Sequence, residues 1–287
     1  MIDLHIHTTY SAGTDTPKEL LQIANRLNLS HISVTDHNSM IAYDELIKYR
    51  KYYDGVIIPG VEITTYYKHE CIDILAYGVD KDIMQKLIKK NLKTLEKRRT
   101  YEVKVMTKKY RGLGFKIDEV HFNTPTELSF RAFYRELSKY PENFEYWGEE
   151  IDYKTWIRQY QNNPKSELFC DFSKAFPKPD KAIKLIKKAG GLAFLAHPFN
   201  YAFDVEKELP LLIKKYDFDG IECMHSTFST EEILYLMKFC KENKLYRSGG
   251  SDYSGINKLN HQIKTGDGSL YISSALINNW VSKIKTI

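Results

Sequence analysis

Short apolar runs alternate with amphipathic stretches in the first sixty residues. Runs of strand length lie at 2–6, 31–35 and 56–59, and helical spacing of apolar positions covers 16–27 and 39–52. Thr16 followed by Pro17 is typical of a helix start, because Thr caps the first turn and Pro fits within it. A strand–helix rhythm of this kind favours a parallel sheet or barrel.

The same alternation returns towards the end of the chain. The pattern predicts helices at 180–189, 207–215 and 230–243, and strands at 192–196, 220–224 and 246–248. Two blocks of strands and helices therefore flank a different middle region.

The middle region lacks a strand rhythm. It opens with a predicted long basic helix over 81–110, which Gly112 and Gly114 end, and continues with helical, aromatic-rich sequence. We expect residues 100–179 to form a helical insertion over the active-site face. Residues 1–99 and 180–287 then form the α/β barrel domain.

Charge and cysteine content narrow the class of protein. The net charge of +5 is uneven, because residues 80–116 hold 13 Lys or Arg and only 4 Asp or Glu. Such a run is either a solvated helix face or a groove for phosphate-rich ligands. The four Cys form no CxxC pair and no run of eighteen apolar residues occurs, so we expect a cytoplasmic protein without a membrane partner.

Two histidines two residues apart stand on the first predicted strand. Side chains at i and i+2 of a strand share a face, so His5 and His7 can reach one metal ion. An HxH pair alone is equally typical of packed core histidines. Its meaning depends on what the other strands supply.

Further metal-competent side chains lie in or directly after later strands. They are His37, Glu62, Asp73, His197 and Asp252. Each alone could be a loop donor, a helix cap or an ion-pair partner. Because the carboxyl ends of parallel strands converge on one face of a barrel, we expect them to meet.

A set of imidazoles and carboxylates without Cys suits Mn²⁺, Zn²⁺, Fe²⁺ or Mg²⁺. A carboxylate can bridge two such ions about 3.5 to 4 Å apart and let them clamp a phosphoryl group. Metal-bound hydroxide then serves as the nucleophile at neutral pH.

The ordered motifs resemble a known family. The segments DLHxH, TDHN, GVEIT, ILAYG, GGLAFLAHP and GGSD look like those of the polymerase and histidinol phosphatase (PHP) family of metal-dependent phosphoesterases. The resemblance implies a distorted (β/α)7 barrel with a two- or three-metal centre. It further implies the metal ligands, namely His5, His7 and Asp252 for the first ion, His197 for the second, Glu62 as the bridge and His37 for a third site.

The insertion resembles one branch of this family most closely. That branch contains nucleoside-monophosphate phosphatases and 5′-to-3′ exoribonucleases, and Glu222 followed by His225 also matches it. Arg131 lies near the position of the branch's substrate-binding Arg, so we expect Arg131 and His225 to bind substrate. The alternative for Arg131 is a surface ion pair. Arg98 and Arg99 are further phosphate-binding candidates.

Three departures from the family pattern change the expected centre. Asp15 is expected to replace a family Asp, because Ala12 stands in the usual position. Asp73 stands where the family has His, which favours harder ions. Ser254 stands where the third-site His is expected, and His225 or His261 could take its place. We therefore expect two divalent ions with a weak or absent third.

Two further inferences concern individual side chains. We expect Asp3 to orient a ligand imidazole. We expect His37 or His225 to protonate the leaving oxygen.

Three functions remain open. The leading one is a metal-dependent phosphoesterase that hydrolyses a small phosphomonoester, most plausibly a nucleotide. The second is a 5′-to-3′ exonuclease on short oligonucleotides, for which the basic helix would form a backbone groove. The third is a degenerate, non-catalytic barrel, which Ala12, Asp73 and Ser254 suggest.

Overall fold

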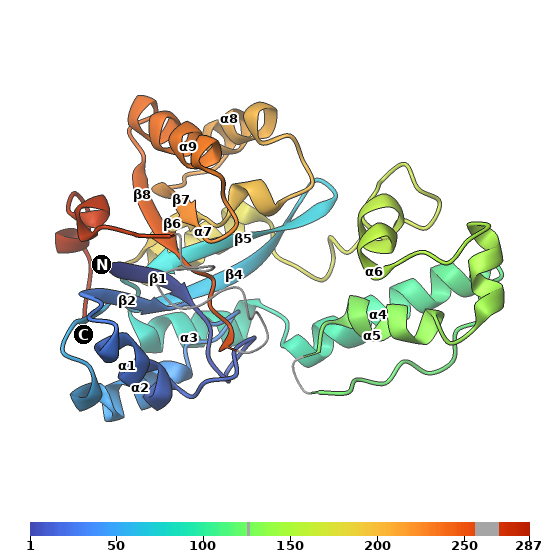
Figure 1. Cartoon of the computed structure of the whole chain (residues 1–287), viewed down its shortest axis with the longest axis horizontal. Coiled ribbons are helices and arrows are strands. Elements are labelled where there is room, and N and C mark those ends of the chain that lie inside the picture. The colour runs from blue at the N-terminus through green and yellow to red at the C-terminus, as the bar shows by residue number, and fades with distance from the viewer. Residues whose placement is uncertain (125–126, 256–269) are drawn as a thin grey trace. The chain divides into compact units, whose positions relative to one another are not determined.

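The computed structural model describes residues 1–124, 127–255 and 270–287, which divide into two compact units (Figure 1). The first unit contains Met1–Thr65, Ile72–Leu92 and Lys178–Ile287. The second contains Tyr66–Cys71 and Lys93–Pro177. The inserted unit thus begins earlier than residue 100 and includes a short segment from the first half of the chain. That it covers the active-site face stays a prediction.

Two sheets carry the strands. The first has the order β1 (Ile2–Ile6), β2 (His31–Val34), β3 (Val56–Ile57), all parallel. The second has the order β4 (Gly60–Tyr67), β5 (Glu70–Tyr77), β6 (Leu192–Leu195), β7 (Gly220–His225), β8 (Tyr246–Gly250).

The expectation of wholly parallel strands is wrong at one position. β6, β7 and β8 are parallel, but β5 runs antiparallel to β6. Only Lys68 and His69 separate β4 from β5, and a two-residue connection reverses the chain direction. Lys68 adopts the left-handed conformation, with φ of 53°, as tight turns between strands require.

Backbone hydrogen bonds outside the ladders join the two sheets. The amide of His7 donates to the carbonyl of Tyr253, just beyond β8, over 2.8 Å. The amide of Glu62 donates to Thr35, and the amide of Asn38 donates to Glu62, over 3.2 and 2.8 Å. These bonds bring the ends of β1 and β2 beside the segments that carry the predicted carboxylates.

Apart from α3, the helices of the first unit follow the predicted pattern closely. They are α1 (Pro17–Arg26), α2 (Ala42–Lys48), α3 (Lys81–Asn91), α7 (Pro179–Lys188), α8 (Val205–Lys215) and α9 (Thr230–Glu242), with 3-10 turns η1 (Arg50–Tyr52), η4 (Pro198–Asn200), η6 (Ser274–Ile277) and η7 (Val281–Lys283). The predicted start of α1 is confirmed, because Thr16 and Glu19 cap each other's backbone amides. None of the helices described is both long and apolar enough to cross a bilayer.

The long helix predicted over 81–110 is wrong. Two helices, α3 and α4 (Leu95–Gly112), replace it. Leu92 and Thr94 have extended backbones, and the Thr94 side chain accepts a hydrogen bond from the amide of Lys97. Thr is a favoured N-cap, so it begins a new helix at the boundary between the two units.

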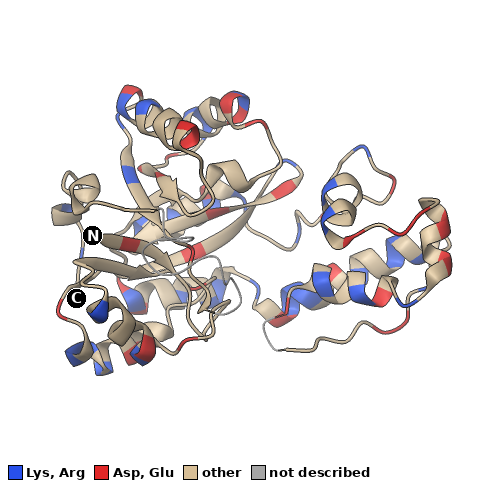
Figure 2. Ribbon diagram, viewed as in Figure 1, with Lys and Arg blue, Asp and Glu red and all other residues tan. Residues whose placement is uncertain are grey.

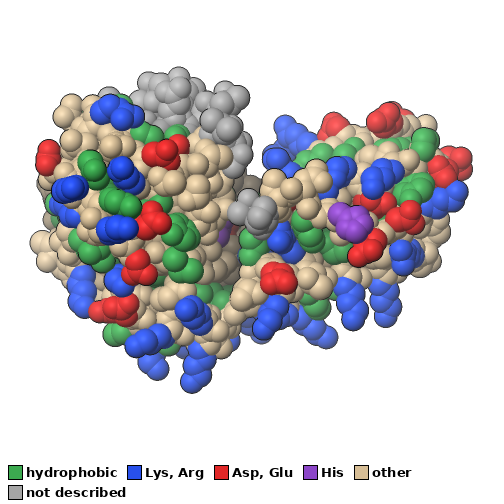
Figure 3. Space-filling view, turned by 90° about the horizontal axis from the view of Figure 1, so that it is seen from below, with side chains coloured by type: hydrophobic (Ala, Val, Ile, Leu, Met, Phe, Trp, Pro, Cys, Tyr) green, Lys and Arg blue, Asp and Glu red, His purple; other side chains and the backbone are tan. Residues whose placement is uncertain are grey.

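The second unit is built largely from helices around an aromatic core. It contains α4, α5 (Ser129–Leu137), α6 (Tyr153–Thr155), the 3-10 helix η2 (Pro141–Tyr146) and the π-helical segment η3 (Trp156–Gln161). Trp156 is fully buried, and its Nε1 donates to the hydroxyl of Tyr110 over 2.8 Å. Figure 2 shows that Lys and Arg recur along α4, and Figure 3 shows such side chains projecting from this unit.

The first unit has its own core, which the C-terminal segment completes. Trp280 is fully buried and stacks on Tyr77, with ring centroids 5.5 Å apart, and lies 5.1 Å from the ring of Phe194. Its Nε1 donates to the carbonyl of Arg247. The C-terminal turns therefore cover strands β5, β6 and β8 rather than forming a separate element.

We predict that Gly250→Ala destabilises the protein by about 2 kcal/mol. A Cβ at position 250 would lie 2.3 Å from the Cβ of His5 and 2.4 Å from its backbone nitrogen, so β1 and β8 would have to separate. Urea unfolding measures the change. Gly112→Ala is the matched control, because nothing lies within 4 Å of its added Cβ. Equal stability of the two variants would contradict the close approach of β1 and β8.

Candidate metal centre

Most of the predicted ligands converge in the first unit. His5 belongs to β1 and His7 follows it, His197 follows β6, His225 ends β7 and Asp252 follows β8. All are buried or nearly so, and His5 and His7 expose at most 1% of their surface. Residues far apart in the chain therefore meet at one end of the strands.

Glu62 lies at the centre of this group. Its Oε2 lies 3.4 Å from His5 Nε2 and 3.3 Å from His7 Nε2. The same oxygen lies 3.1 Å from His37 Nδ1, whereas Oε1 lies 3.1 Å from His197 Nε2. Glu62 is the third residue of β4 and therefore lies within a strand. Its two oxygens face different imidazoles, which is the arrangement that a bridging carboxylate requires.

Asp252 closes the group on the side of β8. Its Oδ1 lies 3.2 Å from His7 Nε2 and 3.8 Å from His5 Nε2, and its Oδ2 lies 3.7 Å from His225 Nε2. Asp252 has a φ of 54° and His197 a φ of 23°. Non-glycine residues with such backbones are strained, and they cluster where the surrounding structure holds a functional geometry.

Asp73 lies at the edge of the group. Its Oδ2 is 4.0 Å from His197 Nε2, on the side of Glu62 that faces His197. Burial raises the pKa of Asp73, and the neighbouring charge of Glu62 raises it further. A nearby cation would counter both effects.

Two predicted residues, Asp15 and Arg131, lie elsewhere. The carboxylate of Asp15 accepts a hydrogen bond from the hydroxyl of Tyr253, and Asp15 belongs to none of the His and acidic groups found among the residues described. Arg131 stands exposed on α5 in the second unit, with its guanidinium 6.0 Å from the centre of the Tyr153 ring. His261 lies outside the described residues.

Arg98 and Arg99 have partners within the second unit. Arg98 Nε lies 3.8 Å from the carboxylate of Glu102. Arg99 donates to the carbonyl of Glu127 and stands over the ring of Phe122. Both are therefore engaged in local packing.

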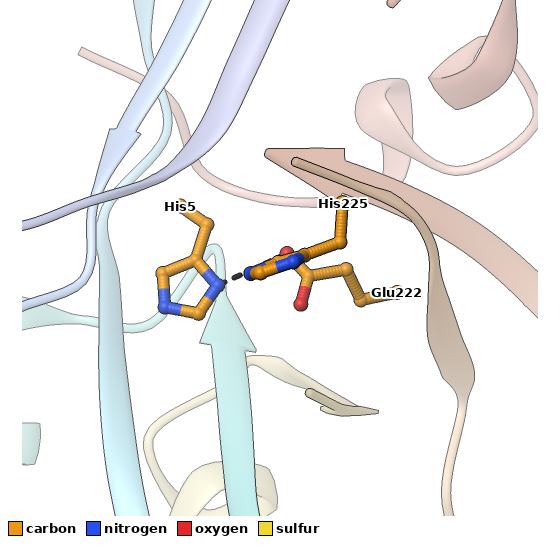
Figure 4. A group of neighbouring side chains, drawn as sticks. All are labelled: His5, Glu222 and His225. Carbon is orange, nitrogen blue, oxygen red and sulfur yellow. Dashed lines mark hydrogen bonds and ion pairs between the residues drawn. The ribbon is translucent and has the colours of Figure 1, made fainter. Parts of the chain in front are cut away.

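Glu222 is a site residue that the sequence reasoning did not select. It is fully buried in β7, and its Oε1 accepts a hydrogen bond from His5 Nδ1 over 3.0 Å (Figure 4). Its Oε2 accepts one from the backbone amide of His197 over 2.8 Å. The sequence did offer a signal for this residue, because an acidic side chain within a mostly apolar strand needs a buried partner.

Asp3 has a different role from the one expected. It accepts hydrogen bonds from the backbone amides of His5 and Ser251 and from the Ser251 hydroxyl. The carboxylate that accepts the hydrogen bond of His5 Nδ1 is that of Glu222, whereas Glu62 and Asp252 lie near Nε2 of the same ring. Asp3 therefore ties β1 to the segment after β8, and Glu222 fixes the ring.

Neighbouring carboxylates raise the pKa of both His5 and His7. Burial lowers the pKa of His5, but the charges of Glu222 and Glu62 outweigh it and place the pKa well above its ordinary value. Burial also lowers the pKa of His7, and hydrogen bonds to Asp252 and Glu62 outweigh it, giving about 9. Without another cation in the group, these imidazoles carry the charge that balances the carboxylates.

The pKa values of Glu62 and His225 are both lowered, for different reasons. Burial raises the pKa of Glu62, but the neighbouring charges of His37 and His5 lower it well below its ordinary range. Burial dominates at His225 and lowers its pKa. Its Nδ1 lies 2.8 Å from the hydroxyl of Thr227.

The donor set fits divalent cations. Four groups bring their donor atoms within 4.8 Å of one another, namely His5–Glu62–His197, His5–His7–Asp252, His7–His37–Glu62 and His5–Glu222–His225. His5 Nε2 and Glu62 Oε2 are buried without a hydrogen bond from the part of the chain described. Imidazole nitrogens and carboxylate oxygens without thiolates suit Mn²⁺, Zn²⁺, Fe²⁺ and Mg²⁺.

The fold and this group define an α/β protein with a His–carboxylate centre at the strand ends. The family model of the PHP domain matches residues 3–174, more than half of the chain, which belongs to the PHP domain family. The family predicted from the sequence motifs is therefore confirmed.

Named relatives and a solved structure resemble most of the chain. It is 27% identical over 255 residues to a 5′-3′ exoribonuclease of Haemophilus influenzae, covering 88% of this chain and 89% of that protein. It is 24% identical over 258 residues to a 3′,5′-nucleoside bisphosphate phosphatase of Chromobacterium violaceum, covering 88% and 86%. The fold resembles that of a Bifidobacterium adolescentis protein named as a metal-dependent phosphoesterase, with a TM-score of 0.65, 19% identity and coverage of 99% and 96%.

We predict that Glu222→Gln weakens Mn²⁺ binding by about 10- to 100-fold while the protein stays folded. The amide keeps the volume of the side chain but removes the charge that orients His5 Nδ1 and the His197 amide. Isothermal titration calorimetry with Mn²⁺ measures the affinity, and circular dichroism checks the fold. Glu242→Gln, at an exposed site on α9, is the control. Unchanged affinity in Glu222→Gln would contradict the positioning role.

We predict that the metal-free protein loses about 2 to 3 kcal/mol of unfolding free energy between pH 6.5 and 9.5 through His7. The folded-state pKa of about 9 exceeds the ordinary 6.5, so the stabilisation is complete below pH 6.5 and is lost as pH rises through 9. Urea unfolding in EDTA measures it. His7→Gln should show a shallower decline, and the same decline in both proteins would contradict this assignment.

Proposed function

We propose that the protein is a metal-dependent phosphoesterase that hydrolyses phosphate esters of nucleotides. The observation that carries the proposal is the position of Glu62, whose two carboxylate oxygens face separate sets of imidazoles inside a buried group. Membership of the PHP domain family supports it. A nucleotide phosphatase and an exoribonuclease among the relatives support the substrate class.

We infer two ion positions that share Glu62. His5, His7 and Asp252 would hold one ion together with Oε2 of Glu62. His197, Asp73 and Oε1 of Glu62 would hold the second ion. A third position beside His37 lacks a strong donor from residue 254, because the Ser254 hydroxyl donates to the carbonyl of Asp252. We therefore propose that a third ion binds weakly.

Divalent ions at these positions would make a water acidic enough to attack at neutral pH and would neutralise the phosphoryl charge. The chain's own residues hold and orient the reactants. His37 is the better candidate for protonating the leaving oxygen, because 35% of its side chain is exposed whereas His225 is buried. His225, held by Thr227, is better suited to fixing Asp252 and the bound phosphate.

We also propose that the two sheets form a distorted seven-stranded barrel. The bonds from His7 to Tyr253 and between Glu62 and the end of β2 support it, because they continue each sheet into the other. In this arrangement β3 and β4 would pair one after the other with β2.

A cytoplasmic location remains our expectation.

The size of the substrate separates the two catalytic candidates. A mononucleotide needs only the ion centre and a phosphate-binding residue, for which Arg131 stays a proposal. An oligonucleotide needs contacts along its backbone as well. The exposed cations of α4 favour this second candidate, a 5′-to-3′ exonuclease on short oligonucleotides.

We predict that wild-type protein with Mn²⁺ hydrolyses at least one of three substrate classes, and that Glu62→Gln reduces its rate at least about 1,000-fold. The classes are nucleoside monophosphates, 3′,5′-bisphosphates and 5′-phosphorylated oligonucleotides. Released phosphate or shortened oligonucleotide measures activity, and elemental analysis measures bound metal. Metal and activity should fall together, because one carboxylate faces both sets of ligands.

Glu45→Gln provides the control, since that carboxylate lies outside the centre and contacts the Tyr10 hydroxyl. Full activity in Glu62→Gln would contradict the bridging role. Less than one equivalent of metal and no hydrolysis in wild-type protein would instead favour a non-catalytic barrel.

A further inference from the structure

Helix α4 exposes a row of cations on the face opposite its core face. Lys97, Lys104, Lys108 and Arg111 are exposed, and their spacings of seven, four and three residues keep them on one side of a helix. The opposite face carries the buried residues of α4, which are Glu102, Met106 and Tyr110. At a rise of about 1.5 Å per residue the row extends over about 21 Å.

The charge of this row is not balanced locally. α4 contains seven Lys or Arg and two Glu, and one of those, Glu102, is buried on the core side. Among the residues described, the only ion pair that involves an α4 cation joins Arg98 to Glu102. The ammonium groups of Lys97, Lys104 and Lys108 therefore face solvent, whereas the Arg111 guanidinium donates two hydrogen bonds to the carbonyl of Ile117. Basic side chains that project from the second unit are visible in Figure 3.

A cavity adjoins the row within the same unit. It has a volume of about 560 Å³ and is lined by Val105, Lys108, Lys109, Gly112, Leu113, Phe169, Cys170 and Asp171. The Asp171 carboxylate already accepts hydrogen bonds from the amide and hydroxyl of Ser173. Apolar side chains and one aromatic ring thus form most of the lining, with Lys108 shared between the cavity and the row.

We propose that this face of the second unit binds a single-stranded nucleic acid, with phosphates along Lys97, Lys104, Lys108 and Arg111 and one base in the cavity. A linear array of cations matches the regular phosphates of a strand, and an apolar cavity beside it accepts a planar base. The proposal deepens the proposed function and rests on it, because it names an oligonucleotide as the substrate class.

The same features argue against a lipid surface. A helix that lies on a membrane presents large apolar side chains beside its cations. The exposed large hydrophobic residues of the described chain include none from α4. A nucleic-acid strand needs no such side chains, because its affinity comes from phosphate contacts and base stacking.

Binding of a fluorescein-labelled ten-nucleotide RNA and its DNA counterpart tests the proposal. The full-length protein is used in EDTA, so that hydrolysis does not interfere. The variant Lys97→Gln/Lys104→Gln/Lys108→Gln should bind at least about tenfold more weakly at low salt, and the slope of log affinity against log salt should fall by about 2. The matched control is Lys188→Gln/Lys214→Gln/Lys241→Gln, which removes three exposed lysines from the first unit and should bind within twofold of wild type.

Two further probes examine the cavity and the class of partner. An oligonucleotide of the same length without bases should bind about tenfold more weakly than the intact strand. The protein should not bind vesicles that contain 30% phosphatidylserine. The proposal would be overturned if the α4 triple variant bound each oligonucleotide as tightly as the control triple variant does, or if the protein bound the vesicles but no oligonucleotide. If the strand without bases bound as tightly as the intact strand, the assignment of a base to the cavity would be wrong.

Activity assays separate this proposal from the proposed function. With Mn²⁺, the α4 triple variant should keep mononucleotide hydrolysis within twofold of wild type and lose at least about fivefold on the oligonucleotide at low concentration. If wild-type protein binds the strand but hydrolyses none of the substrates, the proposed function fails and the binding face stands. If the protein hydrolyses a substrate but does not bind the strand, the binding face is wrong and the proposed function stands.

Discussion

The burial of one carboxylate among imidazoles constrains the rest of the first unit. Glu62 exposes 1% of its surface, and a buried carboxylate is costly unless cations or hydrogen bonds compensate its charge. His5, His7, His37 and His197 supply that compensation when they are protonated. Divalent ions would supply it equally well and would leave the imidazoles neutral. A group that needs cations for its own stability is therefore prepared to bind metal.

The backbone brings these side chains together through close strand contacts. Gly250 leaves room for β1 beside β8, because any Cβ there would overlap His5. The strained backbones of His197 and Asp252 turn their side chains into the group at the ends of β6 and β8. Glu222 then fixes one ring and one backbone amide with its two oxygens. The geometry of the centre therefore depends on the packing of the whole sheet region and not on any one loop.

The two units solve different physical problems. The first buries charge and balances it within a few ångströms, which suits chemistry at one phosphorus atom. The second buries an aromatic core around Trp156 and keeps several cations of α4 in solvent, which suits attraction of an extended anion. Thr94 marks the change from one to the other, because its side chain begins α4 where the first unit ends.

The sequence by itself determined the local features and the list of chemical groups. Helix α1 begins at Thr16 and Pro17 as predicted, and strand alternation and strand ends already indicated His5, His7, Glu62, His197 and Asp252 as metal-competent groups. Only the tertiary structure decided the antiparallel pairing of β5 with β6, the contact of Glu222 with His5 and the pairing of Asp15 with Tyr253. Those features join residues up to 238 positions apart, and no local pattern specifies which distant groups a folded chain brings into contact.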